Sequence, residues 1–314
     1  MADQPNARQT FPGMDAAAFE HPLDRAALEA LRKTPGLALL FRKLGALGPE
    51  RQVRLFFTAD SLRISPRQLP GIYELHREAC ATLDVPEPDL FLFQDPRPNA
   101  FAIGMERFTI VLASGLVELL DADELRSVIG HELGHVKSGH MLYRTIAIFL
   151  WILGDAALRR LPIMALINEA IALAMYDWMR KSELTADRAA LLVAQDQEHV
   201  KRTLLKLAAG KAALGDSAST EEFVRQADDY EDMDTNLLDL VYKFDMTRFQ
   251  THPFPALRAR EIQRWAASPE YGAILSGAYP RADGTAAAER RCPACGARIG
   301  NVQYRFCPEC GSAA

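Results

Sequence analysis

The N-terminal part of the chain passes from a polar stretch to a helical pattern of apolar residues. Residues 1–22 are polar and contain prolines without regular apolar spacing, and they predict a disordered lead-in. Across residues 23–66, apolar residues recur near helical spacing, for example at Leu28, Leu31, Leu37, Leu40 and Leu44. This pattern predicts a helical N-terminal extension that packs on the rest of the molecule.

The stretch from residue 69 to residue 113 changes from a helical to a strand-like pattern. Its first part spaces apolar residues as a helix does, at Ile72, Leu75, Ala79 and Leu83. Short apolar runs follow at 90–93 and 108–112, and the second is rich in residues that favour strands. The expected order is helix, strand, strand, strand, which predicts a small sheet flanked by helices. The expected fold class is α+β and predominantly helical.

Residues 121–135 have the clearest helical pattern. Asp121 is a good N-cap, and Asp123 and Glu124 place negative charge in the first turn, where a helix favours it. One stripe of the helix mixes apolar and polar side chains, namely Leu125, Val128, Ile129, Glu132 and His135. Burying a carboxylate and an imidazole on such a face costs free energy unless they are paired or bound to a metal.

This helix contains the segment His131-Glu132-Leu133-Gly134-His135, which has the pattern H-E-x-x-H. Residues four apart share a helix face, so His131 and His135 can ligate one ion. Glu132 lies about 100° around the axis and can reach a water molecule on the open side of that ion. In this pattern the glutamate is a general base, and zinc lowers the pKa of its bound water toward ~7. The alternative is a helix with two surface histidines and a solvated glutamate.

A zinc hydrolase site needs a third protein ligand. The metzincin pattern requires histidine where the chain has Met141. Because His140 is displaced by one residue, we expect it behind the ligands or in solvent. The better candidate is Glu183 on a second predicted helix, where Asp187 can accept a ring N–H from a ligating histidine. The alternative is an ordinary solvated pair of acidic residues.

Taken together, H-E-x-x-H and the later E-x-x-x-D resemble the M48 peptidases. This gluzincin family includes the HtpX-type quality-control proteases and the zinc-dependent CAAX prenyl proteases. Residues 98–104 also resemble the family's N-A-F-A-x-G segment. The resemblance implies an edge strand beside the cleft that pairs with an extended substrate through Asn99, Ala100 and Phe101.

A fourth segment, residues 251–258, resembles the family's T-H-P-x-x-x-x-R element. The resemblance implies that His252 approaches the metal or the reacting carbonyl and that Arg258 anchors the segment near the site. Without the resemblance, this segment is a helix-entry turn with an incidental histidine. All four motifs occur in the family's order, and we expect the peptidase domain over residues 67–267.

The resemblance implies a zinc-dependent endopeptidase acting on proteins or peptides, with a quality-control role as in the HtpX-type members. The catalytic zinc is expected on His131, His135 and Glu183, with Glu132 as general base and then acid. His252 is expected to stabilise the developing oxyanion. The alternative is a catalytically idle or chaperone-like interaction protein that binds partners through its C-terminal module.

The C-terminus carries two C-P-x-C-G knuckles. Paired thiolates in two tight turns close a zinc tetrahedron, so residues 292–314 predict a structural zinc ribbon with the ligands Cys292, Cys295, Cys307 and Cys310. Two disulfides are the alternative. The fifth cysteine, Cys80, and the absence of a signal-peptide pattern favour reduced, zinc-bound thiolates. Residues 268–291, whose later part lacks apolar periodicity, are expected to be a linker.

Composition limits the partners. With 314 residues, 49% hydrophobic content and a net charge of −5, the chain is typical of a soluble globular protein. It has no basic footprint, so we expect no nucleic-acid partner. The first residues lack the basic-then-apolar order of a signal peptide, which favours a cytoplasmic location. The oligomeric state is not indicated.

Residues 145–175 leave membrane association open. They contain the apolar runs 146–153 and 161–175, separated by Arg159 and Arg160. Each run is shorter or more interrupted than the ~20 apolar residues that a spanning helix needs. In HtpX-type relatives the equivalent interval holds membrane-spanning helices. A buried helical hairpin, a shallow peripheral membrane contact and a spanning hairpin are the three alternatives.

Overall fold

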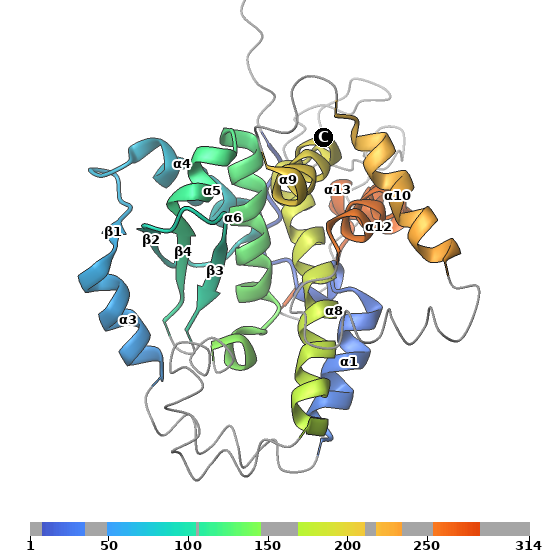
Figure 1. Ribbon diagram of the computed structural model, residues 1–314, viewed down its shortest axis with the longest axis horizontal. Helices are drawn as coiled ribbons and strands as arrows, with labels where there is room; N and C mark the ends of the chain where they lie inside the picture. Colours follow the sequence, from blue (N-terminus) through green and yellow to red (C-terminus); the bar gives the residue numbers. More distant parts are fainter. Residues whose placement is uncertain are drawn as a thin grey trace, which may run out of the picture.

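The computed structural model describes residues 8–34, 49–104, 107–145, 169–210, 218–233 and 254–282. Helices predominate and surround a small sheet (Figure 1), which confirms the expected α+β class. The helices are η1 (Ala16–Ala18), α1 (Pro22–Arg32), α3 (Pro49–Asp60), α4 (Pro70–Leu83), α5 (Ser114–Leu119), α6 (Ala122–Lys137), α8 (Glu169–Ala194), α9 (Gln197–Ala209), α10 (Thr220–Asp232), α12 (Pro255–Ala266) and α13 (Pro269–Leu275). The strands are β1 (Leu62–Arg63), β2 (Asp89–Phe93), β3 (Ala100–Ile103) and β4 (Thr109–Ala113).

The sheet has the strand order β1-β2-β4-β3, so β3 lies at an edge. Strand β4 pairs parallel to β2 and antiparallel to β3, with Phe101 opposite Val111. The predicted helix and three strands in residues 69–113 therefore correspond to α4, β2, β3 and β4. Gly104 follows β3 directly and has a φ of +131°. A Cβ added there would lie 2.2 Å from the carbonyl oxygen of Arg107, so this position excludes a side chain.

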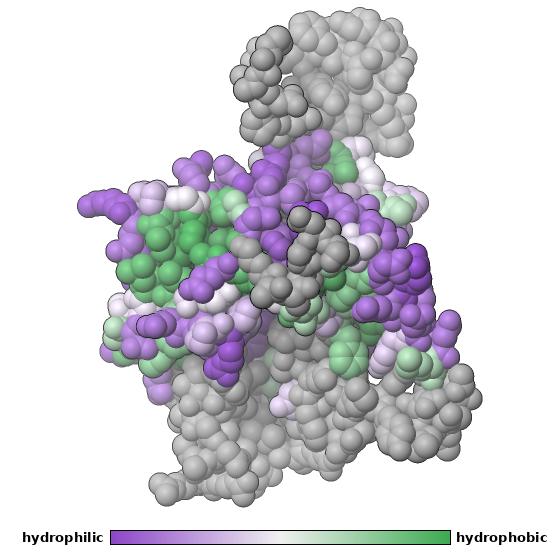
Figure 2. Space-filling view, turned by 45° about the horizontal axis from the view of Figure 1, so that its top comes forward, coloured by the Kyte–Doolittle hydropathy of each residue, from purple (hydrophilic) through white to green (hydrophobic). Residues whose placement is uncertain are grey.

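The two faces of the sheet enter different cores. On one face, Leu90, Ile110 and Leu112 join the main core with residues of α4, α6 and α8. On the other face, Phe91 and Val111 pack with Val53 and Phe57 of α3 in a smaller cluster. Figure 2 shows a hydrophobic area on the side of the molecule that carries the sheet. Exposed apolar side chains of α3 and β1 on that side are Leu55, Phe56 and Leu62.

The expectation of a disordered lead-in over residues 1–22 is wrong for residues 8–22, the part that the structure describes. Phe11, Met14 and Phe19 are at most 1% exposed and belong to the main core. The backbone N–H of Phe11 donates to the carbonyl of Thr82 at 2.9 Å. Isolated apolar residues in a polar stretch have no periodicity to reveal them, yet each buries a large area against existing helices.

The linker expected over residues 268–291 is also wrong in its first part. Residues 269–275 form α13, and Tyr271 and Ile274 are buried in the main core. Further along, Met14 and Arg281 form an antiparallel bridge, so this segment packs on the N-terminal one. Residues 283–291 and the predicted ribbon, 292–314, lie outside the described residues.

Helices α6 and α8 run side by side through the centre of the molecule (Figure 1). The N-terminus of α6 has the expected cap, because the Asp121 carboxylate accepts from the N–H of Glu124 while the Glu124 carboxylate accepts from the N–H of Asp121. Gly134 permits the close approach, since an added Cβ would lie 2.6 Å from the Cβ of Ala189 on α8. The motif helix therefore contacts α8 almost backbone to backbone.

Among the described helices, none combines the length and the apolar character needed to cross a bilayer. Of the interval 145–175, residues 146–168 lie outside the described part of the chain, so its membrane association stays a prediction.

Candidate metal centre

The predicted ligands of the catalytic metal lie together between α6 and α8. The Nε2 atom of His131 is 3.2 Å from Glu183 Oε2, and Nε2 of His135 is 3.3 Å from Glu183 Oε1. The three candidate ligand atoms lie within 4.8 Å of one another, and all three residues are buried. Within the described ranges, no other group of three histidine, cysteine or acidic residues comes together in this way.

The donor set fits a zinc ion. Two imidazole nitrogens and one carboxylate oxygen are ligands that zinc accepts in catalytic sites, with the fourth position left for water. His135 is 0% exposed, and its Nε2 makes no well-aligned hydrogen bond among the described residues, although Glu183 Oε1 lies 3.3 Å away. A buried polar atom without a partner is costly unless a ligand occupies the site.

Asp187 and Arg258 support His131 from behind. Nδ1 of His131 lies 3.0 Å from Asp187 Oδ1, which favours the ring N–H on Nδ1 and leaves Nε2 available to a metal. Arg258, on α12, donates Nε to Asp187 Oδ2 at 2.8 Å and Nη2 to Oδ1 at 2.6 Å. This bidentate ion pair fixes the Asp187 carboxylate. The predicted segment 251–258 therefore contributes to the site through Arg258.

Burial and charge give the two histidines opposite pKa shifts. Burial alone lowers the pKa of His131, but Glu183 and Asp187 outweigh it and raise that pKa to about 9. Burial together with Arg144 holds the pKa of His135 well below its ordinary value. The pKa of Asp187 is lowered despite burial, because Arg258 favours its charged form. Without metal, His131 is therefore the charged member of the pair at neutral pH.

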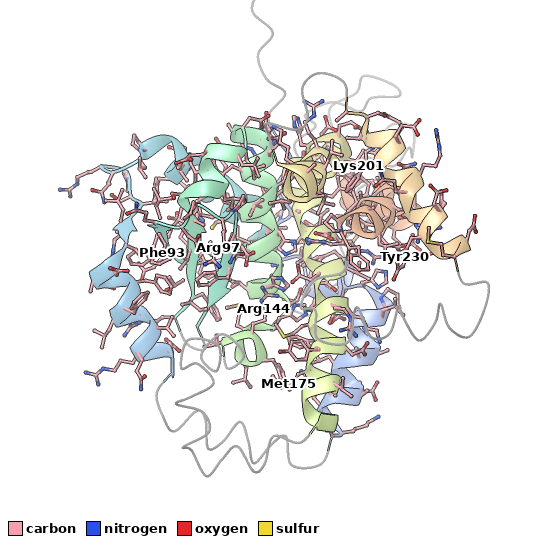
Figure 3. The ribbon with its side chains drawn as sticks, viewed as in Figure 1. Phe93, Arg97, Arg144, Met175, Lys201 and Tyr230 are labelled. Atoms are coloured by element: carbon pink, nitrogen blue, oxygen red, sulfur yellow. The ribbon has the colours of Figure 1, made fainter. Side chains whose placement is uncertain are left out.

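Arg144 is a site residue that the sequence analysis missed. It lies in the helical segment 141–145 after α6, between α6 and α8 (Figure 3), and donates Nη1 to Glu183 Oε1 at 2.8 Å. Arg258 Nη2 lies 3.6 Å from Glu183 Oε2, so two guanidinium groups flank the expected third ligand. The available signal was a charged residue at the start of an apolar run, which is costly to bury without a partner.

Glu132 faces a cleft next to the ligands. A cavity of about 230 Å³ is lined by His131, Glu132, Glu183 and Arg258, by Asn99 and Ala100 at the start of β3, and by apolar residues of α9 such as Val200, Leu204 and Leu207. Glu132 is 3% exposed, and its Oε2 has no hydrogen-bond partner in the described part of the chain. A carboxylate oxygen in this position can accept a proton from a water molecule in the cleft.

Other predicted residues lie elsewhere or outside the described ranges. The Phe101 ring packs on Phe57, with centroids 5.6 Å apart, on the sheet face away from the cleft. His140 is 0% exposed, so it is not in solvent, and its Nδ1 lies 3.1 Å from Nδ1 of His135. His252 and the four predicted ribbon cysteines lie outside the described residues.

Comparisons with known proteins agree with this geometry. Residues 66–266 match the sequence model of peptidase family M48. The plastoglobule-localized metallopeptidase 48, chloroplastic, of Arabidopsis thaliana is 37% identical over 267 residues, which cover 84% of this chain and 77% of that protein. A protease HtpX homolog of Moorella thermoacetica is 41% identical over 97 residues, 30% of this chain and 32% of its own length. A protease HtpX homolog of Syntrophobacter fumaroxidans is 40% identical over 86 residues, 27% and 30% respectively.

Proposed function

Because this chain belongs to peptidase family M48 and is a metalloprotease, we propose that it hydrolyses peptide bonds as a zinc-dependent endopeptidase. The observation that carries the proposal is the convergence of two imidazole Nε2 atoms and the Glu183 carboxylate beside the unpartnered oxygen of Glu132. A site that only stabilised the fold would have no use for a free carboxylate oxygen at the cleft.

His131, His135 and Glu183 would hold the zinc ion. When bound, zinc supplies a Lewis acid that polarises a peptide carbonyl and lowers the pKa of water. Glu132 takes a proton from the attacking water and delivers it to the leaving amine, as base and then acid. Asp187, held by Arg258, keeps the His131 ring in its ligating tautomer. His252 is proposed, on the family resemblance alone, to stabilise the oxyanion.

The substrate is proposed to be an extended protein segment that adds to the edge of the sheet at β3. The carbonyl of Asn99 accepts from the N–H of Ala113 at 2.9 Å, and alternate residues of a strand turn their backbone groups to opposite sides. Ala100 and Ala102 therefore direct their N–H and C=O groups away from β4, toward the free edge. Because Asn99 and Ala100 also line the cleft, a peptide paired there runs past Glu132.

The remaining parts of the proposal concern the ends and the surroundings of the domain. We propose a structural zinc ion on Cys292, Cys295, Cys307 and Cys310, a role in protein quality control and a cytoplasmic location. The plant relative's name places that protein at plastoglobules. Flotation of the full chain with liposomes would separate a buried hairpin at 145–175, which stays at the bottom of the gradient, from peripheral membrane contact.

Glu132→Gln tests the proposed function. We expect cleavage of an unfolded, fluorescently labelled protein to fall by about 10²–10⁴-fold while zinc binding is retained, because the ligands are untouched. Glu118→Gln on α5, an exposed glutamate, is the matched control and should cleave as the wild type does. Equal cleavage by Glu132→Gln and wild type would overturn the mechanism. A wild type that binds zinc but cleaves nothing would favour the idle or chaperone-like alternative.

A further inference from the structure

His135, the second predicted metal ligand, has its own buried support, which ends at a carboxylate outside the region matched by the family. Nδ1 of His135 lies 3.1 Å from Nδ1 of His140, and Nε2 of His140 lies 3.0 Å from Oδ2 of Asp24. All three side chains are 0% exposed. Asp24 belongs to α1, whereas the match to the family begins at residue 66.

The hydrogen positions along this chain of atoms follow from one another. Nε2 of His135 faces Glu183 and would ligate the metal, so the ring hydrogen of His135 lies on Nδ1. That hydrogen can only be donated to an unprotonated Nδ1 of His140, which places the His140 hydrogen on Nε2, facing the Asp24 carboxylate. The Asp24 carboxylate lies at ion-pair distance from this N–H, 3.0 Å from Nε2, although the contact is not aligned as a hydrogen bond. From this position it can favour the ligating tautomer of His135 through the intervening imidazole.

Asp24 is held firmly enough to act in this way. Its Oδ1 accepts from the indole N–H of Trp178 at 3.1 Å, and its Oδ2 accepts from the hydroxyl of Thr185 at 2.5 Å. Both donors lie on α8, the helix that also carries Glu183. The Trp178 ring further packs edge to face on His140, with centroids 5.5 Å apart, so the intervening imidazole is fixed as well.

We propose that Asp24 is a positioning residue for the metal ligand His135, acting through His140, so that helix α1 completes the metal centre. The proposal rests on the proposed metal site. Outer carboxylate partners of ligating histidines orient the ring and raise its basicity, and losing one costs about 10–100-fold in metal affinity. The N-terminal helix is therefore part of the zinc site rather than an appendage.

Asp24→Asn tests the proposal in the full chain, with Asp15→Asn as the matched control. The control makes the same charge change in the same segment, where the Asp15 side chain caps η1 and does not reach His140. The zinc dissociation constant of the catalytic site is measured by competition with a chromophoric chelator, and the cobalt-substituted absorption spectrum reports ligand geometry. We expect Asp24→Asn to weaken zinc binding by about 10–100-fold and to change the cobalt spectrum, with no change in the control.

Wild-type zinc affinity in a folded Asp24→Asn protein would overturn the proposal, and so would a lower melting temperature without a change in affinity. If Asp24→Asn does not fold, His140→Phe decides, because it keeps a ring against Trp178 and leaves the other Asp24 bonds in place. The same loss of affinity supports the proposal, and wild-type affinity overturns it. Failure of the proposed function is distinct, because it would appear as unchanged cleavage in Glu132→Gln.

Discussion

The two histidines of the proposed metal site are held by different sets of contacts that serve the same purpose. His131 donates directly to Asp187, a carboxylate of α8 that Arg258 neutralises. His135 reaches its carboxylate, Asp24 of α1, only through a second imidazole. The first support is compact and charged, and the second is longer and spans two further segments of the chain. One histidine is therefore held by a residue that the spacing of a local motif predicts. The other is held by a residue that only tertiary packing brings near.

The electrostatic consequences differ in the same way. The carboxylates around His131 raise its pKa to about 9, whereas burial and Arg144 keep the pKa of His135 well below its ordinary value. In the metal-free protein at neutral pH, His131 must lose a proton before it can ligate, and His135 is already neutral. In the metal-free protein at neutral pH, the positive charge therefore lies on His131 and not on His135.

Removing the guanidinium of Arg258 should produce the largest effect. Arg258→Met leaves the buried Asp187 carboxylate dependent on His131, and breaking such a pair costs about 3–5 kcal/mol. Urea unfolding of the chelated protein measures the free energy of unfolding. Arg264→Met on the same helix, whose side chain is 57% exposed, is the control and should cost at most about 1 kcal/mol. Equal costs for the two variants would show that the His131 support is not held by the buried pair.

A smaller loss is expected from Gly134→Ala, which tests the helix contact that both supports need. The added methyl group would lie 2.6 Å from the Cβ of Ala189, so α6 and α8 must separate at a cost of about 1–3 kcal/mol. Gly71→Ala in α4 is the control, because an added Cβ there meets no atom within 4 Å. If both substitutions leave the melting temperature and the zinc affinity unchanged, close contact between the helices is not required.

The unequal titration of the two histidines is the subtlest prediction. Side-chain ¹⁵N shifts of the chelated protein, assigned with His131→Gln and His135→Gln, should show His131 titrating near pH 9 and His135 neutral above pH 6.5, its ordinary pKa. Because the folded pKa of His131 is raised, its contribution to stability is complete below pH 6.5 and is lost as the pH rises through about 9. Two histidines that titrate together near pH 6.5 would contradict the comparison.

The sequence could predict whatever depends on spacing within one helix or one short motif. His131, His135, Glu183 and Asp187 follow from positions four apart on two helices, and the structure brings all four together. The cap of α6 and the edge position of β3 also agree with the sequence analysis.

What the sequence could not reveal depends on distant contacts. Asp24 is an ordinary acidic residue in the first turn of an amphipathic helix, and only the packing of α1 on α8 brings it to His140. Phe11 and Phe19 lie in a polar stretch without a periodic pattern, so the sequence does not indicate that both are buried in the main core. The ion pair between Arg144 and Glu183 likewise forms only when distant segments fold together.

The central claim is that His131, His135 and Glu183 form one zinc site, and anomalous X-ray scattering at the zinc edge tests it most directly. In crystals of the full chain grown with zinc, we expect a peak about 2.0–2.2 Å from Nε2 of His131, Nε2 of His135 and a carboxylate oxygen of Glu183. Zinc density elsewhere in the crystal with none between these three side chains, or a peak on Nδ1 of either histidine, would contradict the account.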